Sequence, residues 1–140
     1  MFSITNPKDI VDNLLTILNA ADETKGVEWH KGEPARSKWN KYPFGWVEWD
    51  GETIKPKTSV SEKIYPRIFI AVVDRNIHEG KAEDSIMDFA VKVKDAVKIT
   101  PTLLGSVETS WFTDRDKEKF FEEDHSIVGV GLKLTGYYFE

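Results

Sequence analysis

The sequence predicts an α+β fold, in which a mainly antiparallel sheet has two amphipathic helices packed on one face. Two segments, residues 6–26 and 82–98, repeat apolar side chains every three or four positions, as amphipathic helices do. Residues 64–74 form a strand-length run that is apolar on both faces. Residues 126–139 alternate apolar and small or polar side chains, which is typical of a strand with one buried face.

The composition limits the classes of function. With 140 residues the chain has the size of one domain, and we expect residues 1–140 to form a single domain with a loop-rich, aromatic hairpin insert at about 27–63. The net charge of -5 argues against a general nucleic-acid-binding surface, because such a surface needs cations to neutralise phosphates. The chain has no cysteine, which excludes disulfides, thiolate metal sites and cysteine nucleophiles.

Targeting and membrane signals are not expected in this sequence. The first ten residues lack the basic segment and apolar run of a signal peptide. The longest apolar run, residues 68–73, is far shorter than the roughly 20 residues that span a bilayer. We therefore expect a protein that acts inside a cell or within an assembly.

Both helices have start or stop signals. Asn6 can cap the first helix, Pro7 suits its first turn, and Asp9 places a negative charge near its N-terminus. Gly26 is the expected end of this helix. The second helix is expected to end before the Thr100-Pro101 pair.

The segment between the first helix and the central strand is expected to contain a hairpin. Residues 42–49 alternate like a strand, Asp50-Gly51 is a typical two-residue hairpin turn, and residues 52–58 would form the returning strand. Pro56 predicts that this strand lies at a sheet edge. After the second helix, residues 103–112 are expected to form a further strand before the closing one.

No catalytic or cofactor site is predicted. The three histidines have no ligand spacing, phosphate-binding glycine motifs are missing, and no serine lies in a nucleophile elbow. A metal-dependent enzyme built around residues 122–125 is an open alternative, against a solvated acidic loop. Residues 114–119 alternate acids and bases, so we expect a salt-bridged surface there rather than a pair of catalytic carboxylates.

Residues 29–67 have the most unusual composition of the chain, because aromatic side chains are interleaved there with Lys and Arg. Three interpretations stay open. The aromatic rings could stack on single-stranded nucleic acid, form an interface between copies or with a partner, or cover the core of a small sheet.

The order of elements resembles a known family, the tail terminator (tail completion) proteins of long-tailed phages and prophages. The resemblance rests on the N-terminal helix, the hairpin-bearing insert, the strand at 68–73, the helix that begins at 85–91 and the closing strand at 128–134. It covers most of the chain but includes no diagnostic motif. Residues 29–63 align with nothing in the family.

The resemblance implies a structural, non-enzymatic role. Proteins of this family form a ring, commonly a hexamer, that stops growth of the tail tube and presents the surface that joins the head. The implied partners are the tail tube protein and head–tail connector proteins, DNA passes through the channel without specific binding, and the implied location is the virion, with assembly in the host cytoplasm. The aromatic segment before residue 68 is basic and residues 114–124 are acidic, which suits contacts between copies. The candidate interface residues are Trp39, Tyr42, Phe44, Trp46, Trp49, Lys55, Lys57, Asp114, Asp116 and Glu118.

Overall fold

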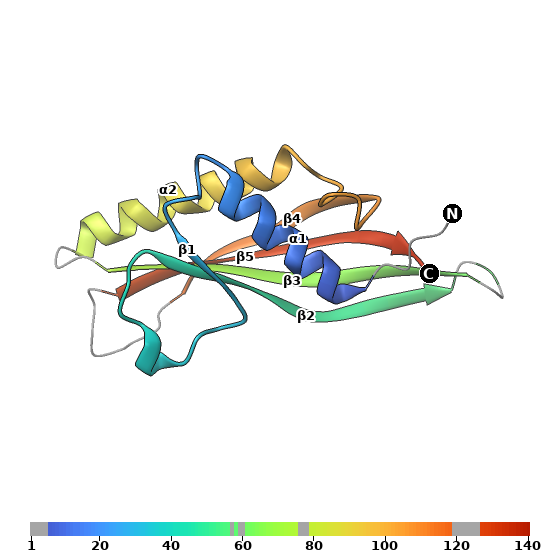
Figure 1. Ribbon diagram of the computed structural model, residues 1–140, viewed down its shortest axis with the longest axis horizontal. Coiled ribbons are helices and arrows are strands. Elements are labelled where there is room, and N and C mark those ends of the chain that lie inside the picture. Colours follow the sequence, from blue (N-terminus) through green and yellow to red (C-terminus); the bar gives the residue numbers. More distant parts are fainter. Residues whose placement is uncertain (1–5, 57, 59–60, 76–78, 119–126) are drawn as a thin grey trace.

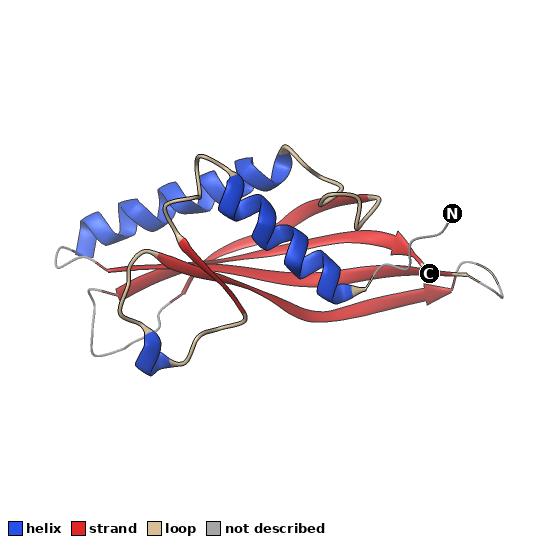
Figure 2. Cartoon of the chain, in the orientation of Figure 1, coloured by secondary structure: helices blue, strands red, loops and turns tan. Residues whose placement is uncertain are grey.

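The computed structural model describes residues 6–56, 58, 61–75, 79–118 and 127–140, and at 79, 80, 82 and 118 it describes the backbone alone. These residues form two α-helices, a short 3-10 helix and five strands that run along the long axis of the molecule (Figure 1, Figure 2). The elements are α1 (Pro7–Ala20), β1 (Glu28–Lys31), η1 (Arg36–Lys38), β2 (Phe44–Pro56), β3 (Glu62–Arg75), α2 (Glu79–Lys98), β4 (Thr109–Glu118) and β5 (Ile127–Phe139).

The five strands form one sheet in the order β1-β2-β3-β5-β4. Only the short β1–β2 pair is parallel, and the other three pairs are antiparallel. The predicted α+β class with a mainly antiparallel sheet is therefore confirmed. The strand that is apolar on both faces, β3, lies in the middle of the sheet as expected. A central strand needs apolar side chains on both faces when both faces of the sheet are covered.

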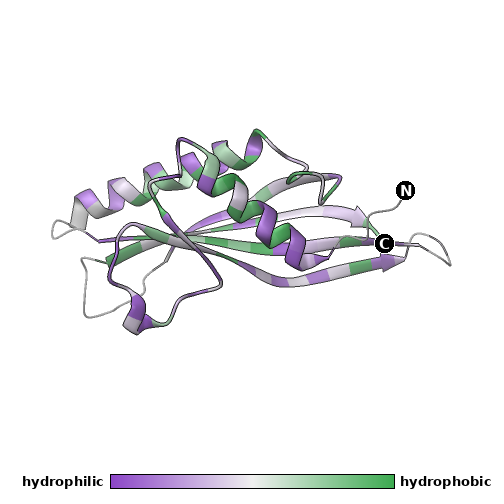
Figure 3. Ribbon diagram, viewed as in Figure 1, coloured by the Kyte–Doolittle hydropathy of each residue, from purple (hydrophilic) through white to green (hydrophobic). Residues whose placement is uncertain are grey.

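Both helices pack on the same face of the sheet, which we call the helix face. α1 contacts β1 and β2, while α2 contacts β5, β3 and β4. Figure 3 shows polar and apolar residues in bands along both helices, which leaves one apolar side for the sheet. The core on this face includes Leu14, Leu18, Ile70, Val93 and Leu132, each with no exposed surface.

The start of α1 agrees with the sequence prediction, but its end does not. The side chain of Asn6 accepts a 2.9 Å hydrogen bond from the backbone N–H of Lys8, so Asn6 is the N-cap. The helix ends at Ala20, well before Gly26. Thr24 explains the early end, because its buried hydroxyl donates a 2.7 Å hydrogen bond to the carbonyl oxygen of Leu18 and holds the chain in a turn.

The predicted hairpin at Asp50-Gly51 is wrong. β2 continues through this pair as one strand and stays beside β3, with a register shift between Trp49 and Glu52. Gly51 has a φ of +95°, a positive value that glycine adopts readily. Such a value occurs in the hairpin turn that the sequence predicted, and it also occurs in β-bulges. β3 has 14 residues and pairs with both halves of β2, so no return strand is needed. Because β1 pairs only with residues 44–47, the half of β2 that contains Pro56 lies at the sheet edge, as predicted.

The strand predicted at 103–112 begins later, at Thr109, and extends to Glu118. Leu103, Leu104 and Gly105 all have positive φ, so the chain turns there and cannot start a strand. The charged residues 114–118 are thus part of an edge strand that pairs with β5. β5 itself matches the prediction: residues 128, 130, 132 and 134 are buried toward the helices.

Candidate functional site

Two of the candidate interface residues lie in the core. Phe44 and Trp46 are 2% and 1% exposed, in a second apolar cluster on the face of the sheet opposite the helices. The insert around η1 folds over this cluster, and the half-buried Trp39 and Tyr42 pack against it. The Trp39 and Phe44 ring centroids are 5.0 Å apart, and Trp39 Nε1 donates a 3.0 Å hydrogen bond to the carbonyl oxygen of Pro34. These aromatic residues cover one end of the sheet, and Phe44 and Trp46 present almost no surface to a partner.

The remaining candidates lie mostly on the surface. Trp49 is 51% exposed on the helix face, near the start of α1, and Lys55 is exposed on the opposite face. Asp114 and Asp116 are exposed on β4. Glu118 ends the same strand, with its backbone paired to Gly129, and Lys57 lies outside the described residues.

In the described part of the run 114–119, the expected salt-bridged surface consists of one ion pair, which Lys117 forms with α2. Side chains of a strand alternate between its two faces, and the register places Asp114 opposite Lys133 on one face and Arg115 opposite Leu132 on the other. Lys117 shares the face of Arg115 and forms an ion pair with Glu83 of α2. The strand therefore separates its acids from its bases.

The part of the sheet face beyond the insert is uncovered by any other described element, and we call it the open face. It carries cations, aromatic rings, a threonine and, at its β4 edge, two carboxylates: Lys55, Lys63, Tyr65, Arg67, Trp111, Asp114, Asp116, Lys133, Thr135, Tyr137 and Phe139. Nζ of Lys63 lies 4.1 Å from the ring centroid of Tyr137 and 5.3 Å from that of Tyr65. These are distances at which an ammonium group is attracted to the face of an aromatic ring.

The open face contains a polar hollow of about 310 Å³ beside Arg67 and Lys133. The guanidinium of Arg67 is fixed there, because it donates hydrogen bonds to Thr53 Oγ1 at 2.8 Å and to the Asp50 carbonyl oxygen at 3.3 Å. Lys133 is exposed at the other side of the hollow. Two cations, several hydroxyls and one acid, Asp50, line the hollow.

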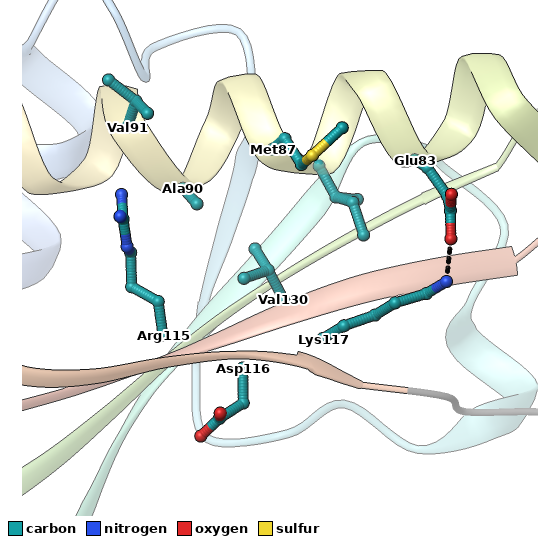
Figure 4. A pocket seen from close by; sticks show the side chains of 9 residues that line it. Glu83, Met87, Ala90, Val91, Arg115, Asp116, Lys117 and Val130 are labelled. Carbon is teal, nitrogen blue, oxygen red and sulfur yellow. Dashed lines mark hydrogen bonds and ion pairs between the residues drawn. The ribbon is translucent and has the colours of Figure 1, made fainter.

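A second candidate surface lies on the helix face, between α2 and the edge strand β4, and we call it the α2–β4 seam. It holds two hollows, of about 400 and 240 Å³. The larger one is lined by apolar side chains of α2 and β5, including Met87, Val91 and Val130, and by Arg115 and Lys117 of β4. Figure 4 shows Arg115 directed toward α2, while Asp116 points to the other side of the strand.

The α2–β4 seam has an apolar floor and a basic rim. The smaller hollow is lined by Val97, Phe112 and Leu134, with Lys94 and Lys98 of α2 beside them. In the larger hollow Lys117 is paired with Glu83, whereas Arg115 has no such partner among the described residues (Figure 4). Met87 and Val91 are 59% and 48% exposed, although both are large apolar side chains. Such a surface is typical of a contact with another protein.

One titratable group in the sheet is strongly perturbed. Burial raises the pKa of the Tyr138 phenol well above its usual range, and its hydrogen bond to Glu52 Oε1, at 2.9 Å, raises this pKa further. The phenol therefore stays protonated and donates to the carboxylate. This arrangement joins β5 to β2 and does not resemble an acid–base site, because it faces no cleft that the structure describes.

Metal and membrane sites were also considered. The described residues contain no group of three or more His, Asp or Glu side chains that could hold a metal ion. The alternative metal site at 122–125 lies outside the described residues. Among the helices of the described ranges, none has the length and apolar character that a bilayer crossing requires.

Of the candidate residues predicted from the sequence, Lys55, Asp114 and Asp116 lie on the open face or at the seam, and the other residues of these two surfaces were not predicted. A signal for the open face exists in hindsight: Lys63, Tyr65 and Arg67 recur at every second position, as do Lys133, Thr135 and Tyr137. That spacing places each set on one strand face. The seam has no such signal, because it joins a helix and a strand that are separated along the chain.

Comparison with known proteins gives limited similarity. No protein-family model and no curated protein sequence matches this chain. A solved structure described as "Virion of native gene transfer agent (GTA) particle" is similar over 89% of this chain and 90% of that chain, with 11% sequence identity and a TM-score of 0.49. Similarity at this level does not establish a shared function.

Proposed function

We propose that this protein is a structural virion-assembly protein that forms a ring at the end of a phage tail tube. In this role it ends growth of the tube and provides the surface to which the head is joined. The proposed ring is a hexamer, its neighbours are the tail tube protein and head–tail connector proteins, and DNA passes through its channel without specific binding. It would be assembled in the host cytoplasm and remain in the virion as a non-enzymatic component.

The observation that supports this proposal best is the set of large apolar side chains left exposed on both edges of the sheet. Trp49 and Ile54 of β2 are 51% and 56% exposed, and Met87 and Val91 are exposed beside β4. A monomer gains nothing from such exposure, whereas burial of apolar surface stabilises association by roughly 25 cal/mol per Å². The order of helices and strands, which resembles that of tail terminator proteins, supports the same proposal.

Sedimentation velocity over a wide range of protein concentration tests the proposal. We expect a closed oligomer that grows with concentration and appears as rings in negative-stain images. A single monomeric species up to the highest concentration would contradict a ring-forming role.

Nucleic-acid binding is the second candidate function, and the open face favours it over the segment 29–67 as a whole. The buried Phe44 and Trp46 cannot stack on bases, but Lys55, Lys63, Tyr65 and Arg67 from that segment lie together on the open face. Cations beside exposed rings on a sheet are the arrangement that single-stranded nucleic acid uses.

A salt titration distinguishes this candidate. Trp111, which is 43% exposed on the open face, should report binding of a single-stranded DNA oligonucleotide by fluorescence quenching. Quenching should weaken as salt rises and fall in K63A, with K8A, a lysine outside the open face, as control. Unchanged fluorescence at low salt would remove this candidate.

A further inference from the structure

The two edges of the sheet differ in a way that makes one complementary to the other. The edge at the bulge of β2 has the sequence Glu48-Trp49-Asp50-Gly51-Glu52, and among these residues Trp49 and Asp50 are exposed. Glu48 and Glu52 accept hydrogen bonds from Trp46 and Tyr138, so Asp50 is the exposed carboxylate of this edge, next to a protruding indole. Lys8 and Lys31 line the hollow beside the indole, and Lys31 is paired with Asp12. The α2–β4 seam at the opposite edge has an apolar floor and a rim of Lys94, Lys98 and Arg115.

We propose that Trp49 and the neighbouring Asp50 bind in the α2–β4 seam of a second copy of this chain. The inference rests on the proposed ring-forming function and specifies the contact between neighbouring copies. The Asp50 carboxylate and the basic rim of the seam attract each other, and both surfaces expose apolar side chains that the contact would bury. Because two different surfaces meet, the contact is heterologous, and repeating it produces a ring if the rotation between copies closes.

The register of the sheet supports this pairing of surfaces. Trp49 lies opposite Ile68, Ile68 opposite Leu134, and Leu134 opposite Phe112, so one row on the helix face connects the two edges. Phe112 and Leu134 line the smaller hollow of the seam. A second copy placed beside β4 in the same orientation therefore brings its Trp49 level with that hollow.

The charges at that level are complementary as well. Lys94 and Lys98 belong to the lining of the smaller hollow, and Asp50 follows Trp49 on the edge of β2. The side chain of Asp50 is exposed, while its carbonyl oxygen accepts a hydrogen bond from Arg67 and fixes the bulge. In the proposed contact this carboxylate would lie beside the ammonium groups of the rim.

Charge reversal provides the first test. D50K and K98E should each raise the concentration at half-dissociation of the oligomer at least ten-fold, measured by sedimentation velocity. The double variant D50K/K98E should restore assembly, because each contact again joins opposite charges. E62K makes the same charge change at an exposed residue at the start of β3, six positions along that strand from Ile68, the partner of Trp49, and should have no effect.

Removal of the indole provides the second test. W49A should weaken assembly by a similar or larger factor, while F139A removes an aromatic side chain that is 41% exposed on the open face and should leave assembly unchanged. Circular dichroism and urea unfolding would verify that each variant is folded. If folded W49A and D50K form the native oligomer at native concentrations, the proposed contact is wrong although a ring-forming function stands.

Cross-linking then locates the contact directly. The chain has no cysteine, so D50C/K98C contains only the introduced pair. Position 50 lies on β2 and position 98 at the end of α2, and only a disulfide between copies gives species larger than the monomer on a denaturing, non-reducing gel. Oxidation should give a ladder of covalent oligomers. A native protein that is monomeric at every concentration would overturn both the proposed function and this contact, whereas an oligomer without the ladder would overturn the contact alone.

Discussion

The hydroxyl of Tyr138 donates a 2.9 Å hydrogen bond to Oε1 of Glu52, and this bond joins β5 to β2 across the strand between them. Tyr138 is 4% exposed and packs in the core on the helix face. Glu52 directly follows the bulge of β2, at the point where the strand returns to register with β3. The bond therefore stabilises the half of β2 that has no partner on its outer side.

Removing this hydroxyl should destabilise the fold. In Y138F the carboxylate of Glu52 loses a donor while the ring stays in place, and we expect the free energy of unfolding to fall by about 1–2 kcal/mol. Urea unfolding measures the change. E52Q keeps an acceptor and serves as the control, so a loss in Y138F no larger than in E52Q would contradict a specific contribution from this bond.

The same pair predicts a pH dependence at the alkaline end. The folded-state pKa of Tyr138 is raised, so its contribution to stability is fully present below the unfolded value of about 10 and is lost as pH rises above it. Urea midpoints between pH 9 and 11 should fall more steeply for the native chain than for Y138F. Parallel pH profiles would show that the phenol ionises equally in both states.

Gly45 is required by close packing. A Cβ atom at this position would lie 2.5 Å from the carbonyl oxygen of Ala71 and 2.6 Å from the ring of Trp29. G45A should therefore lower the free energy of unfolding by about 1–3 kcal/mol, as overpacking does in other cores. G26A is the matched control, because nothing lies within 4 Å of a Cβ there. Equal stability of the two variants would mean that β2 adjusts without cost.

Trp39 should hold the insert on the sheet. Its ring packs on Phe44 and Trp46, and its indole N–H is bonded to Pro34. In W39A we expect about 2 kcal/mol lower stability, less than the usual loss for a fully buried tryptophan, together with faster proteolysis within residues 32–43. S37A changes an exposed residue of the same segment and should not alter either measurement. Unchanged cleavage in W39A would show that other contacts hold the insert.

Local patterns in the sequence predicted the elements whose period is long and regular. Apolar residues that recur every three or four positions predicted α1 and α2, and alternation at every second position predicted β5. The two apolar faces of its sequence predicted β3. The prediction of a hairpin at Asp50-Gly51 was wrong, because a glycine with positive φ occurs in β-bulges as well as in hairpin turns. Here β3 is long enough to pair with β2 on both sides of the bulge. The parallel pairing of β1 with β2 depends on contacts between distant segments and leaves no local pattern.

The candidate surfaces were harder to predict than the fold. Aromatic composition alone did not distinguish Trp46, which is buried, from Trp49, which is half exposed, although they are three residues apart. Strand alternation places them on opposite faces, and only the insert decides which face is covered. Charge composition similarly suggested local ion pairs along β4, whereas Lys117 finds its partner, Glu83, on α2.

The bulge at Thr113 changes which side chains of β4 face the helices and which face away from them. Phe112 lies opposite Leu134 and Asp114 opposite Lys133, so this one extra residue reverses the alternation that Trp111 and Phe112 began. Without it the carboxylates of Asp114 and Asp116 would face α2, and Arg115 would move to the open face. A single inserted residue, itself uncharged, thus decides the sign of the electrostatic potential on both sides of the edge strand.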